Sequence, residues 1–239
     1  MNRSALVTGA GGGLGAALAI GLARAGFAVG LHYHTSAAGA LETQRTIEAA
    51  GGSAQLVQAD LGTDAGARAA AAALDGVFGS LDLLVNNAGV YVDVPGLDLS
   101  EADWHRGIDS TAAAVFFTTR ACLPLLRRGA GKRIVNIGDS SADRPGARDL
   151  AWSYHIGKTG VWILTRSFAA AEAANGIAVN MVSPGILENS IGDVRGERIP
   201  AGHLGTFADI VEVVRYLASD APAYLSGSDL VVSGGWNLR

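Results

Sequence analysis

The sequence predicts an α/β protein of the doubly wound Rossmann type, with a seven-stranded, mostly parallel sheet and helices on both faces. Short apolar runs alternate with longer, alanine-rich amphipathic stretches along the whole chain. The short runs are apolar at successive positions, as in parallel strands that helices cover on both sides. Right-handed crossovers between such strands wind the chain into one open sheet.

A single domain is expected over residues 1–239, because no proline-rich linker, low-complexity segment or solenoid-length repeat divides the chain. We expect a cofactor-binding half over about residues 1–136 and a catalytic and substrate-binding part over about residues 137–239. Apolar residues make up 49% of the chain and charged residues 17%, so a sizeable core can be buried.

Charge and cysteine content exclude several classes of protein. The net charge of −4 argues against a nucleic-acid or membrane-surface binder. One cysteine, Cys122, cannot form an intrachain disulfide and fits a reducing compartment. No run approaches the roughly 18 apolar residues of a membrane span, and the amino end lacks the features of a secretory signal. We therefore expect a cytoplasmic protein that binds a small-molecule substrate.

The elements follow one another in regular order. The expected strands are the apolar runs at residues 4–9, 28–34, 54–60, 81–87, 133–138, 177–183 and 229–235. Helical patterns lie between them, at residues 14–26, 40–51 and 209–220. The alanine cluster at residues 67–73 also predicts a helix, since alanine is the best helix former.

A glycine-rich turn joins the first strand to the first helix, in "TGAGGGLG" at residues 8–15. Gly9 permits a tight turn, and Gly13 and Gly15, on either side of Leu14, let the backbone amides and the helix approach a bound pyrophosphate. The amino end of the helix then faces the negative charge. At this position the turn predicts a dinucleotide site.

The end of the second strand bears on the choice of nicotinamide cofactor. An acid there would bind the ribose 2′-hydroxyl and repel a 2′-phosphate. The sequence instead has His34, Thr35 and Ser36, whose donors can hold a phosphate. NADP(H) is therefore the predicted cofactor. NAD(H) remains the alternative, because no arginine follows the second strand to bind the 2′-phosphate. His32 is expected to be a strand residue with no ligand role, and no third ligand is spaced to form a metal site with the histidines.

A tyrosine and a lysine lie four positions apart, at Tyr154 and Lys158. On a helix they share one face, so the ammonium can act on the phenol. A nearby positive charge should lower the phenol pKa from its ordinary value of about 10, which suits Tyr154 to proton transfer. Such a pair usually has a third polar partner, and Asp139, Ser140 and Ser141 are the candidates.

Together these motifs resemble the short-chain dehydrogenase/reductase family over nearly the whole chain. The family patterns stand here as the TGxxxGxG turn, Asp60 after the third strand, "NNAG" at 86–89, "YHIGK" at 154–158 and a proline-glycine turn after the sixth strand. The resemblance implies that Tyr154 exchanges the proton and that Lys158 tunes it and binds the nicotinamide ribose. It also implies a homodimer or homotetramer, built partly on the helix around residues 152–174 and on the carboxyl end. Further cofactor contacts are implied for Asp60, Leu61, Asn87, Ala88, Gly89, Pro184, Gly185 and Ile186.

A narrower resemblance points to pteridine and dihydromonapterin reductases, through "LHYHTSAAGA" and "SGGWNLR". In that branch an aspartate replaces the family's serine after the fifth strand. Counting from the strand, with Asn136 aligned to the family's asparagine, places this position at Asp139. Counting back thirteen residues from Tyr154 places it at Ser141. We favour Asp139, because loops accept insertions more readily than strand ends do. An ionised aspartate can only accept hydrogen bonds, which favours a nitrogen heterocycle with a reducible C=N bond.

Two further features bear on function. Thr111 occupies the position of the family's catalytic asparagine, and threonine would not supply the same backbone kink and water site. The basic run at residues 127–133 is expected to be a solvated loop, or alternatively a docking site for an acidic acyl carrier protein.

The predicted function is an NADPH-dependent oxidoreductase that transfers hydride to a small C=N or C=O substrate, including a pterin. The first alternative is a 3-ketoacyl reductase or a general ketone/alcohol oxidoreductase. An alternative of another class is a dinucleotide-binding sensor with impaired catalysis. The segment after Pro184 is expected to cover the substrate.

Overall fold

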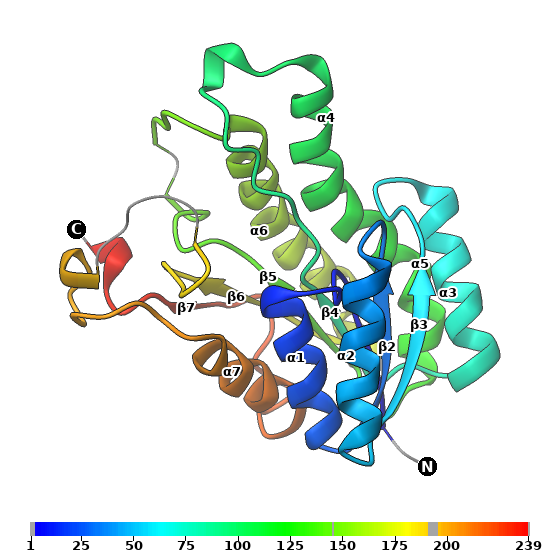
Figure 1. The fold of residues 1–239 in the computed structure, drawn as a ribbon. Helices are drawn as coiled ribbons and strands as arrows, with labels where there is room; N and C mark the ends of the chain where they lie inside the picture. Colours follow the sequence, from blue (N-terminus) through cyan, green and yellow to red (C-terminus); the bar gives the residue numbers. More distant parts are fainter. Residues whose placement is uncertain (1–2, 145, 191–195, 239) are drawn as a thin grey trace.

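The computed structural model describes residues 3–144, 146–190 and 196–238. Within them one sheet contains seven strands in the order β3-β2-β1-β4-β5-β6-β7, and all neighbours are parallel (Figure 1). The strands are β1 Arg3–Val7, β2 Phe27–Tyr33, β3 Ser53–Gln58, β4 Leu83–Asn86, β5 Arg133–Ile137, β6 Ala178–Pro184 and β7 Asp229–Val232. The predicted sheet is confirmed, and each predicted strand overlaps an observed one.

Seven α-helices connect the strands in the described part of the chain. They are α1 Gly13–Arg24, α2 Ala37–Ala49, α3 Asp64–Phe78, α4 Glu101–Ile108, α5 Ala114–Arg128, α6 Trp152–Glu172 and α7 Phe207–Ser219. The alanine cluster lies within α3, whose buried face consists of Ala67, Ala70, Ala71 and Leu74. None of these helices has both the length and the hydropathy needed to cross a membrane.

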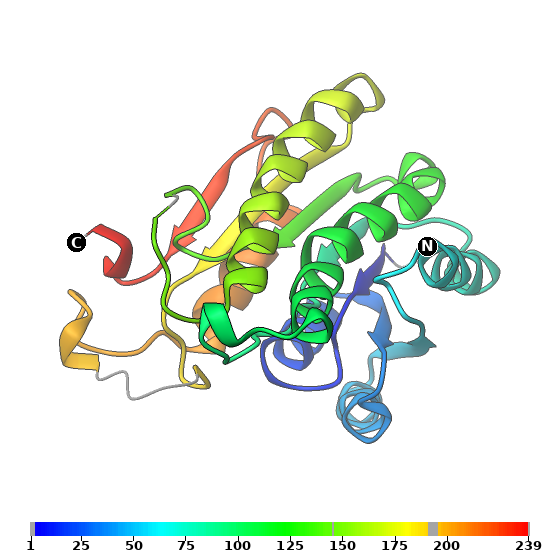
Figure 2. The ribbon, with the colours of Figure 1, turned by 90° about the horizontal axis from the view of Figure 1, so that it is seen from above.

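Two cores lie on opposite faces of the sheet. Helices α1 and α7 pack side by side over one face and bury Leu18, Leu22 and Val214 among the strand residues (Figure 1). Helices α3, α5 and α6 cover the other face with a second core, which includes Leu74 and Leu126 (Figure 2). The strands are apolar on both sides because the sheet lies between two layers of helices.

The helices differ in how their amino ends are capped. Thr63 caps α3, and Ser100 and Thr206 form capping boxes at the starts of α4 and α7. By contrast, Gly12 and Ser36 precede α1 and α2 without capping them by a side chain. The first-turn amides of α1 are therefore available to an anion at the carboxyl edge of the sheet, whereas in α2 the amide of Ala37 already donates to the carbonyl of Thr35.

Candidate active site

A cavity of about 370 Å³ opens where the strand order reverses, beside β1 and β4. Ligands of open α/β sheets bind at such a point. Eight of the residues predicted to bind cofactor line this cavity, and these are Gly9, His34, Thr35, Ser36, Asp60, Leu61, Ala88 and Gly89. The cavity is also lined by Gly11, Gly12 and His32.

Close packing explains the glycines of the first turn. Gly9 has φ of +68°, and a Cβ there would lie 3.0 Å from the Cα of Ala88. A Cβ on Gly15 would lie 2.0 Å from the carbonyl oxygen of Gly9, so only glycine lets α1 pack on the turn. The side-chain amide of Asn87 donates to the carbonyl of Thr8 at 2.9 Å and so anchors the turn to β4. Gly13 has φ of +52°, while Leu14 packs against the core under α1.

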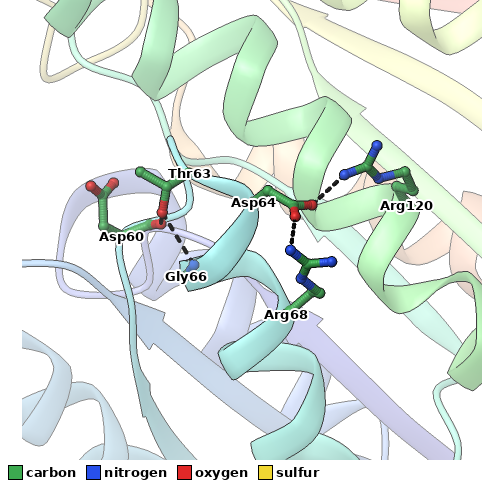
Figure 3. Close-up of polar contacts among 6 residues, drawn as sticks. All are labelled: Asp60, Thr63, Asp64, Gly66, Arg68 and Arg120. Atoms are coloured by element: carbon green, nitrogen blue, oxygen red, sulfur yellow. Dashed lines mark hydrogen bonds and ion pairs between the residues drawn. The ribbon is translucent and has the colours of Figure 1, made fainter.

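The loop after β3 holds Asp60 at the opposite wall of the cavity. The carboxylate of Asp60 accepts from the amide of Gly62 at 3.0 Å, and the hydroxyl of Thr63 donates to the carbonyl of Asp60 at 3.0 Å. Thr63 also caps α3 by accepting from the amide of Gly66 (Figure 3). The next residue, Asp64, pairs with Arg68 and Arg120, which ties this loop to α5 (Figure 3). The position of Asp60 is therefore set by capping and ion pairing around it.

The segment after β2 is exposed at the rim of the cavity. His34, Thr35 and Ser36 all line it, and Asp60 is the only acidic residue among the lining residues described. The hydroxyl of Ser36 donates to the carbonyl of Gly11 at 3.2 Å, which links the start of α2 to the glycine-rich turn. The uncapped amino end of α2 thus lies beside three polar side chains without a negative charge.

Tyr154 and Lys158 share one face of α6, as predicted. The ammonium of Lys158 lies 5.6 Å from the centre of the Tyr154 ring and donates to the carbonyl of Ile137 at 2.7 Å. Lys158 is buried, and burial lowers its pKa to about 8. Burial, with the negative charge of Asp139, raises the pKa of Tyr154 above its ordinary value. The expected lowering by Lys158 is therefore wrong for the chain itself, because burial and the carboxylate act in the opposite direction.

Asp139 and Ser141 form a single unit. The amide and the hydroxyl of Ser141 both donate to the same carboxylate oxygen of Asp139, at 2.8 Å and 2.5 Å. Asp139 acts electrostatically on Tyr154 and on Lys158, raising the pKa of each. Ser140 is buried, and its amide donates to the carbonyl of Pro184. The structure thus brings both candidates into the site instead of selecting one.

Two aromatic residues beside Tyr154 were not predicted. The ring of Tyr91 meets the ring of Tyr154 edge-on at 5.1 Å between centres, and the ring of His155 lies 5.4 Å from that of Tyr154. Burial raises the pKa of Tyr91 and lowers that of His155. Tyr91 follows the "NNAG" turn by two positions, which was the only available signal, because its contact with α6 spans many residues of sequence.

The backbone is widened at Thr111, contrary to the expectation from the sequence. Residues Asp109–Ala113 form a π-helical turn between α4 and α5. The buried hydroxyl of Thr111 donates to the carbonyl of Gly107 at 2.6 Å, and a Cβ on Gly157 would lie 1.8 Å from this hydroxyl. The hydroxyl of Thr111 therefore bonds within the turn, and the side chain packs against α6 at Gly157, the residue before Lys158.

Buried amides connect the strands beneath the site. Asn86 on β4 donates to the side-chain oxygen of Asn136 on β5 at 2.8 Å. Asn136 in turn donates to the hydroxyl of Thr165 on α6 at 2.8 Å. This chain of bonds holds α6 against the sheet, which fixes the position of Tyr154 relative to β4 and β5.

The turn after β6 closes the site from the side of β7. Pro184 ends β6, and the amide of Gly185 donates to the carbonyl of Val232 at 2.9 Å. A Cβ on Gly185 would lie 2.7 Å from the Cα of Ser233. The carbonyl of Ile186 accepts from the amide of Gly205, so the ends of the expected covering segment are held together. Residues 191–195 of that segment lie outside the described residues.

The basic run at residues 127–133 is committed to internal contacts. Arg127 pairs with Glu172, and Arg128 pairs with Asp75. Lys132 and Arg133 donate to backbone carbonyls. This pattern favours a structural role over the docking of an acidic partner. Among the residues described, no three His, Cys, Asp or Glu side chains come together in a metal-binding arrangement.

Comparisons with known proteins agree with this geometry. Residues 9–237 match the family model described as enoyl-(acyl carrier protein) reductase. The 3-oxoacyl-[acyl-carrier-protein] reductase FabG of Staphylococcus aureus is 33% identical over 245 residues, which cover 98% of both chains.

Two solved structures extend the likeness to three dimensions. The gluconate 5-dehydrogenase of Burkholderia cenocepacia, in complex with NADP and tartrate, has a TM-score of 0.90 and 31% identity, covering 99% of this chain and 96% of that one. The acetoin dehydrogenase of Enterobacter cloacae has a TM-score of 0.89 and 31% identity, covering 100% and 96%.

Proposed function

Because the chain belongs to the short-chain dehydrogenase/reductase family, we propose that it reduces a small ketone with NADPH, in the manner of a 3-oxoacyl reductase. The observation that carries this proposal is the placement of Tyr154, Lys158 and the Asp139–Ser141 unit on α6 and after β5, at the same sheet edge as the dinucleotide cavity. Oxidation of the matching alcohol is the reverse of the same reaction.

The cavity residues fit an NADP(H) cofactor. The glycine-rich turn and the uncapped start of α1 suit a pyrophosphate, and a Cβ on Gly12 would meet nothing within 4 Å. Asp60 and Leu61 lie at the adenine end, and His34, Thr35 and Ser36 offer donors to a 2′-phosphate. The bound cofactor supplies the hydride, and the structural relative that contains NADP supports this choice. On this assignment residues 1–136 supply most cofactor contacts and residues 137–239 most of the chemistry.

The residues of the chain supply the proton and orient the substrate. Tyr154 donates its phenolic proton to the oxygen that gains negative charge during reduction. Its raised pKa keeps it protonated at neutral pH, and the carboxylate of Asp139 reinforces this state. Lys158, fixed by the carbonyl of Ile137, places a positive charge near the phenolate that remains. The edge-on ring of Tyr91 restricts the approach to Tyr154.

A pterin or another C=N substrate is the second candidate. The observation that favours it is the Asp139–Ser141 unit, in which the serine proton is already used within the pair. The unit then presents acceptors, which suit the N–H groups of an amino-heterocycle better than a carbonyl oxygen.

Activity against a substrate panel tests the proposal. NADPH oxidation should be followed with acetoacetyl thioesters, simple ketones and dihydropterins. Tyr154→Phe should lose at least about a hundredfold in kcat with the active substrate, because it removes the proton donor while it keeps the ring. Its affinity for NADP⁺ should stay within about threefold of the parent. Turnover of Tyr154→Phe near the parent level, or no turnover of any compound by the parent, would refute the proposal, and the second result would favour the sensor alternative.

Cofactor preference gives a separate prediction. Thr35→Asp places a carboxylate beside the predicted 2′-phosphate site, so it should lower kcat/KM for NADPH at least tenfold and leave that for NADH equal or higher. The matched control is Thr46→Asp, at a half-buried position of α2 away from the cavity. Steady-state kinetics with both cofactors decide the matter, and a parent enzyme that prefers NADH would contradict the assignment.

Homo-oligomer formation is also part of this proposal. A cavity of about 630 Å³ lies along α6, and it is lined by Ser141 and Lys158 of the site as well as by Trp152, Ile156 and Ile163. Ile156 and Ile163 follow Tyr154 by two and nine positions, which places them on roughly the opposite side of the helix. They are 52% and 61% exposed. This outer face of α6 supports the predicted contact with a second copy of the chain.

A further inference from the structure

The most informative unassigned residue is His32, which the sequence presents as an ordinary strand residue. Its ring is only 2% exposed, near the carboxyl end of β2. Its Nδ1 accepts from the amide of Gly9 at 3.2 Å, and its Nε2 lies 3.1 Å from the carbonyl oxygen of Ala59. The backbone carbonyl of His32 also accepts from the amide of Ala10 at 2.8 Å. One residue thus binds two successive amides of the glycine-rich turn.

The partners of the ring define a single protonation state. The Gly9 amide is a donor, so Nδ1 must present a lone pair, and the Ala59 carbonyl is an acceptor, so Nε2 must carry the proton. An imidazolium would direct an N–H group at the N–H of Gly9. Burial lowers the pKa of His32 to about 4, so the neutral ring is the stable form at neutral pH. The titratable groups that act on it are His34, just after β2, and Asp60, after β3.

The ring also joins two walls of the cofactor cavity. Gly9 belongs to the turn beside the predicted pyrophosphate, and Ala59 immediately precedes Asp60 at the predicted adenine end. The backbone of Gly9 has φ of +68°, a conformation that residues other than glycine rarely adopt. A bond to the Gly9 amide therefore constrains the turn at its tightest point.

We infer that His32 is a positioning residue, which as the Nε2–H tautomer holds the glycine-rich turn in its cofactor-binding shape. This inference rests on the proposed function, because it assigns the cavity to NADP(H). Without the ring the Gly9 amide loses its acceptor, and the turn must be reordered when the cofactor binds. His32 would thus act on affinity without touching the reacting atoms.

Three substitutions separate the two bonds of the ring. His32→Asn keeps an acceptor near the position of Nδ1, His32→Gln keeps a donor near the position of Nε2, and His32→Leu removes both. The dissociation constant of NADP⁺ should be measured by calorimetry for each variant. We expect His32→Asn to bind within about threefold of the parent, and His32→Gln and His32→Leu to bind about tenfold more weakly. Catalytic turnover at saturating cofactor should change less than twofold.

A core variant controls for stability alone. Val29→Ala truncates a fully buried side chain on the same strand, outside the cavity lining, and should lower the melting temperature without changing the NADP⁺ dissociation constant more than twofold. In the parent, ¹⁵N NMR of labelled histidine at pH 6 should show His32 with a bare Nδ1 and a protonated Nε2. That measurement needs no variant to fold.

The outcomes distinguish this inference from the proposed function. A parent that does not bind NADP⁺ would refute the cofactor assignment and the inference together. If the parent binds NADP⁺ and both His32→Gln and His32→Leu bind it as tightly as the parent does, the inference is refuted but the cofactor assignment is not. A protonated Nδ1, or an equal loss of affinity in Val29→Ala, would also overturn it.

Discussion

At the scale of single residues, the site combines charges that act against each other on the same phenol. Lys158 lies 5.6 Å from the ring of Tyr154, while Asp139 raises the pKa of both groups. A carboxylate near the proton donor favours its protonated form, which is the form that reduction needs. The turn after β5 therefore carries a residue, Asp139, that biases the site toward proton donation.

Removal of this charge should move the pH profile. Asp139→Asn keeps the shape but removes the negative charge, so the pKa values of Tyr154 and Lys158 should both fall. Reduction requires the protonated phenol, and kcat/KM declines as pH rises through the pKa of the donor. The basic limb of the profile should therefore move to lower pH, by about one unit.

Ser141→Ala is the matched control, because it removes the hydroxyl bonded to Asp139 but keeps the carboxylate. Its basic limb should stay within about 0.3 pH units of the parent. The pH dependence of kcat/KM is measured for all three proteins with the same ketone. An unmoved limb in Asp139→Asn, or a shift to higher pH, would contradict the role given to this charge.

Residue prediction from sequence succeeded where the relevant distance is local. The spacing of Tyr154 and Lys158 defines their shared helix face, so one helical turn was enough to place them together. The contacts of Tyr91 with Tyr154 and of His32 with Gly9 and Ala59 depend on how separate segments meet. No local pattern encodes them. The two counts for Asp139 and Ser141 differ by two residues, and the structure places both residues together, bonded to each other.

At the scale of elements, two loops determine where α6 begins. The amide of Ala151 donates to the carbonyl of Val94, and the amide of Gly96 donates to the carbonyl of Asp149. Ala151 has φ of +56°, a left-handed conformation that few non-glycine residues adopt. The ring of Trp152 lies against Gly96, where a Cβ would come within 1.8 Å of it. The catalytic helix therefore starts from a tightly packed junction with the loop after β4.

A pair of glycine substitutions tests this junction. Gly96→Ala should lower the free energy of unfolding by about 1–3 kcal/mol, because the added methyl group overlaps the Trp152 ring. Gly76→Ala, at an exposed position of α3 where a Cβ would meet nothing within 4 Å, should raise it by about 0.5–1 kcal/mol. Urea denaturation measures both.

Activity provides the second readout for the same pair. Gly96→Ala should also lower kcat, since it displaces the start of the helix that carries Tyr154, and Gly76→Ala should leave kcat unchanged. Equal stability of the two variants would show that the junction tolerates rearrangement and would contradict the packing argument.

The elements themselves were well predicted because their signals are local. Each strand is a short apolar run, and the observed bounds differ from the predicted ones by three residues or fewer. The π-helical turn at Asp109–Ala113 was missed, since the polar and alanine residues "DSTAA" fit an ordinary helix equally well. Thr111 in this turn packs against Gly157 of α6, a contact that belongs to the tertiary structure and leaves no local pattern.

At the scale of the whole molecule, strand alternation predicted the sheet and its parallel strands, because only crossover helices can join such strands. The outer surface is less accessible to sequence reasoning. The outer face of α6 carries exposed Ile156 and Ile163 on an otherwise amphipathic helix. Periodicity identifies the face of the helix that is turned to the sheet, but it cannot show what covers the opposite face. A charged side chain introduced on that opposite face can test whether a second subunit covers it.

Ile163→Glu should convert an oligomer into monomers. Ile163 is 61% exposed in the single chain, so glutamate there is harmless to the monomer, but a subunit interface would bury its charge without a partner. Val77→Glu is the matched control, because Val77 is a 53% exposed branched residue on α3, away from α6. Sedimentation velocity should show the parent and Val77→Glu at a dimer or tetramer mass and Ile163→Glu at the monomer mass. The melting temperatures of the parent and of Val77→Glu should then rise with protein concentration, since association stabilises the folded chain by mass action, and that of Ile163→Glu should not. A monomeric parent, or an Ile163→Glu protein with the parent's mass, would show that this face of α6 stays exposed in solution.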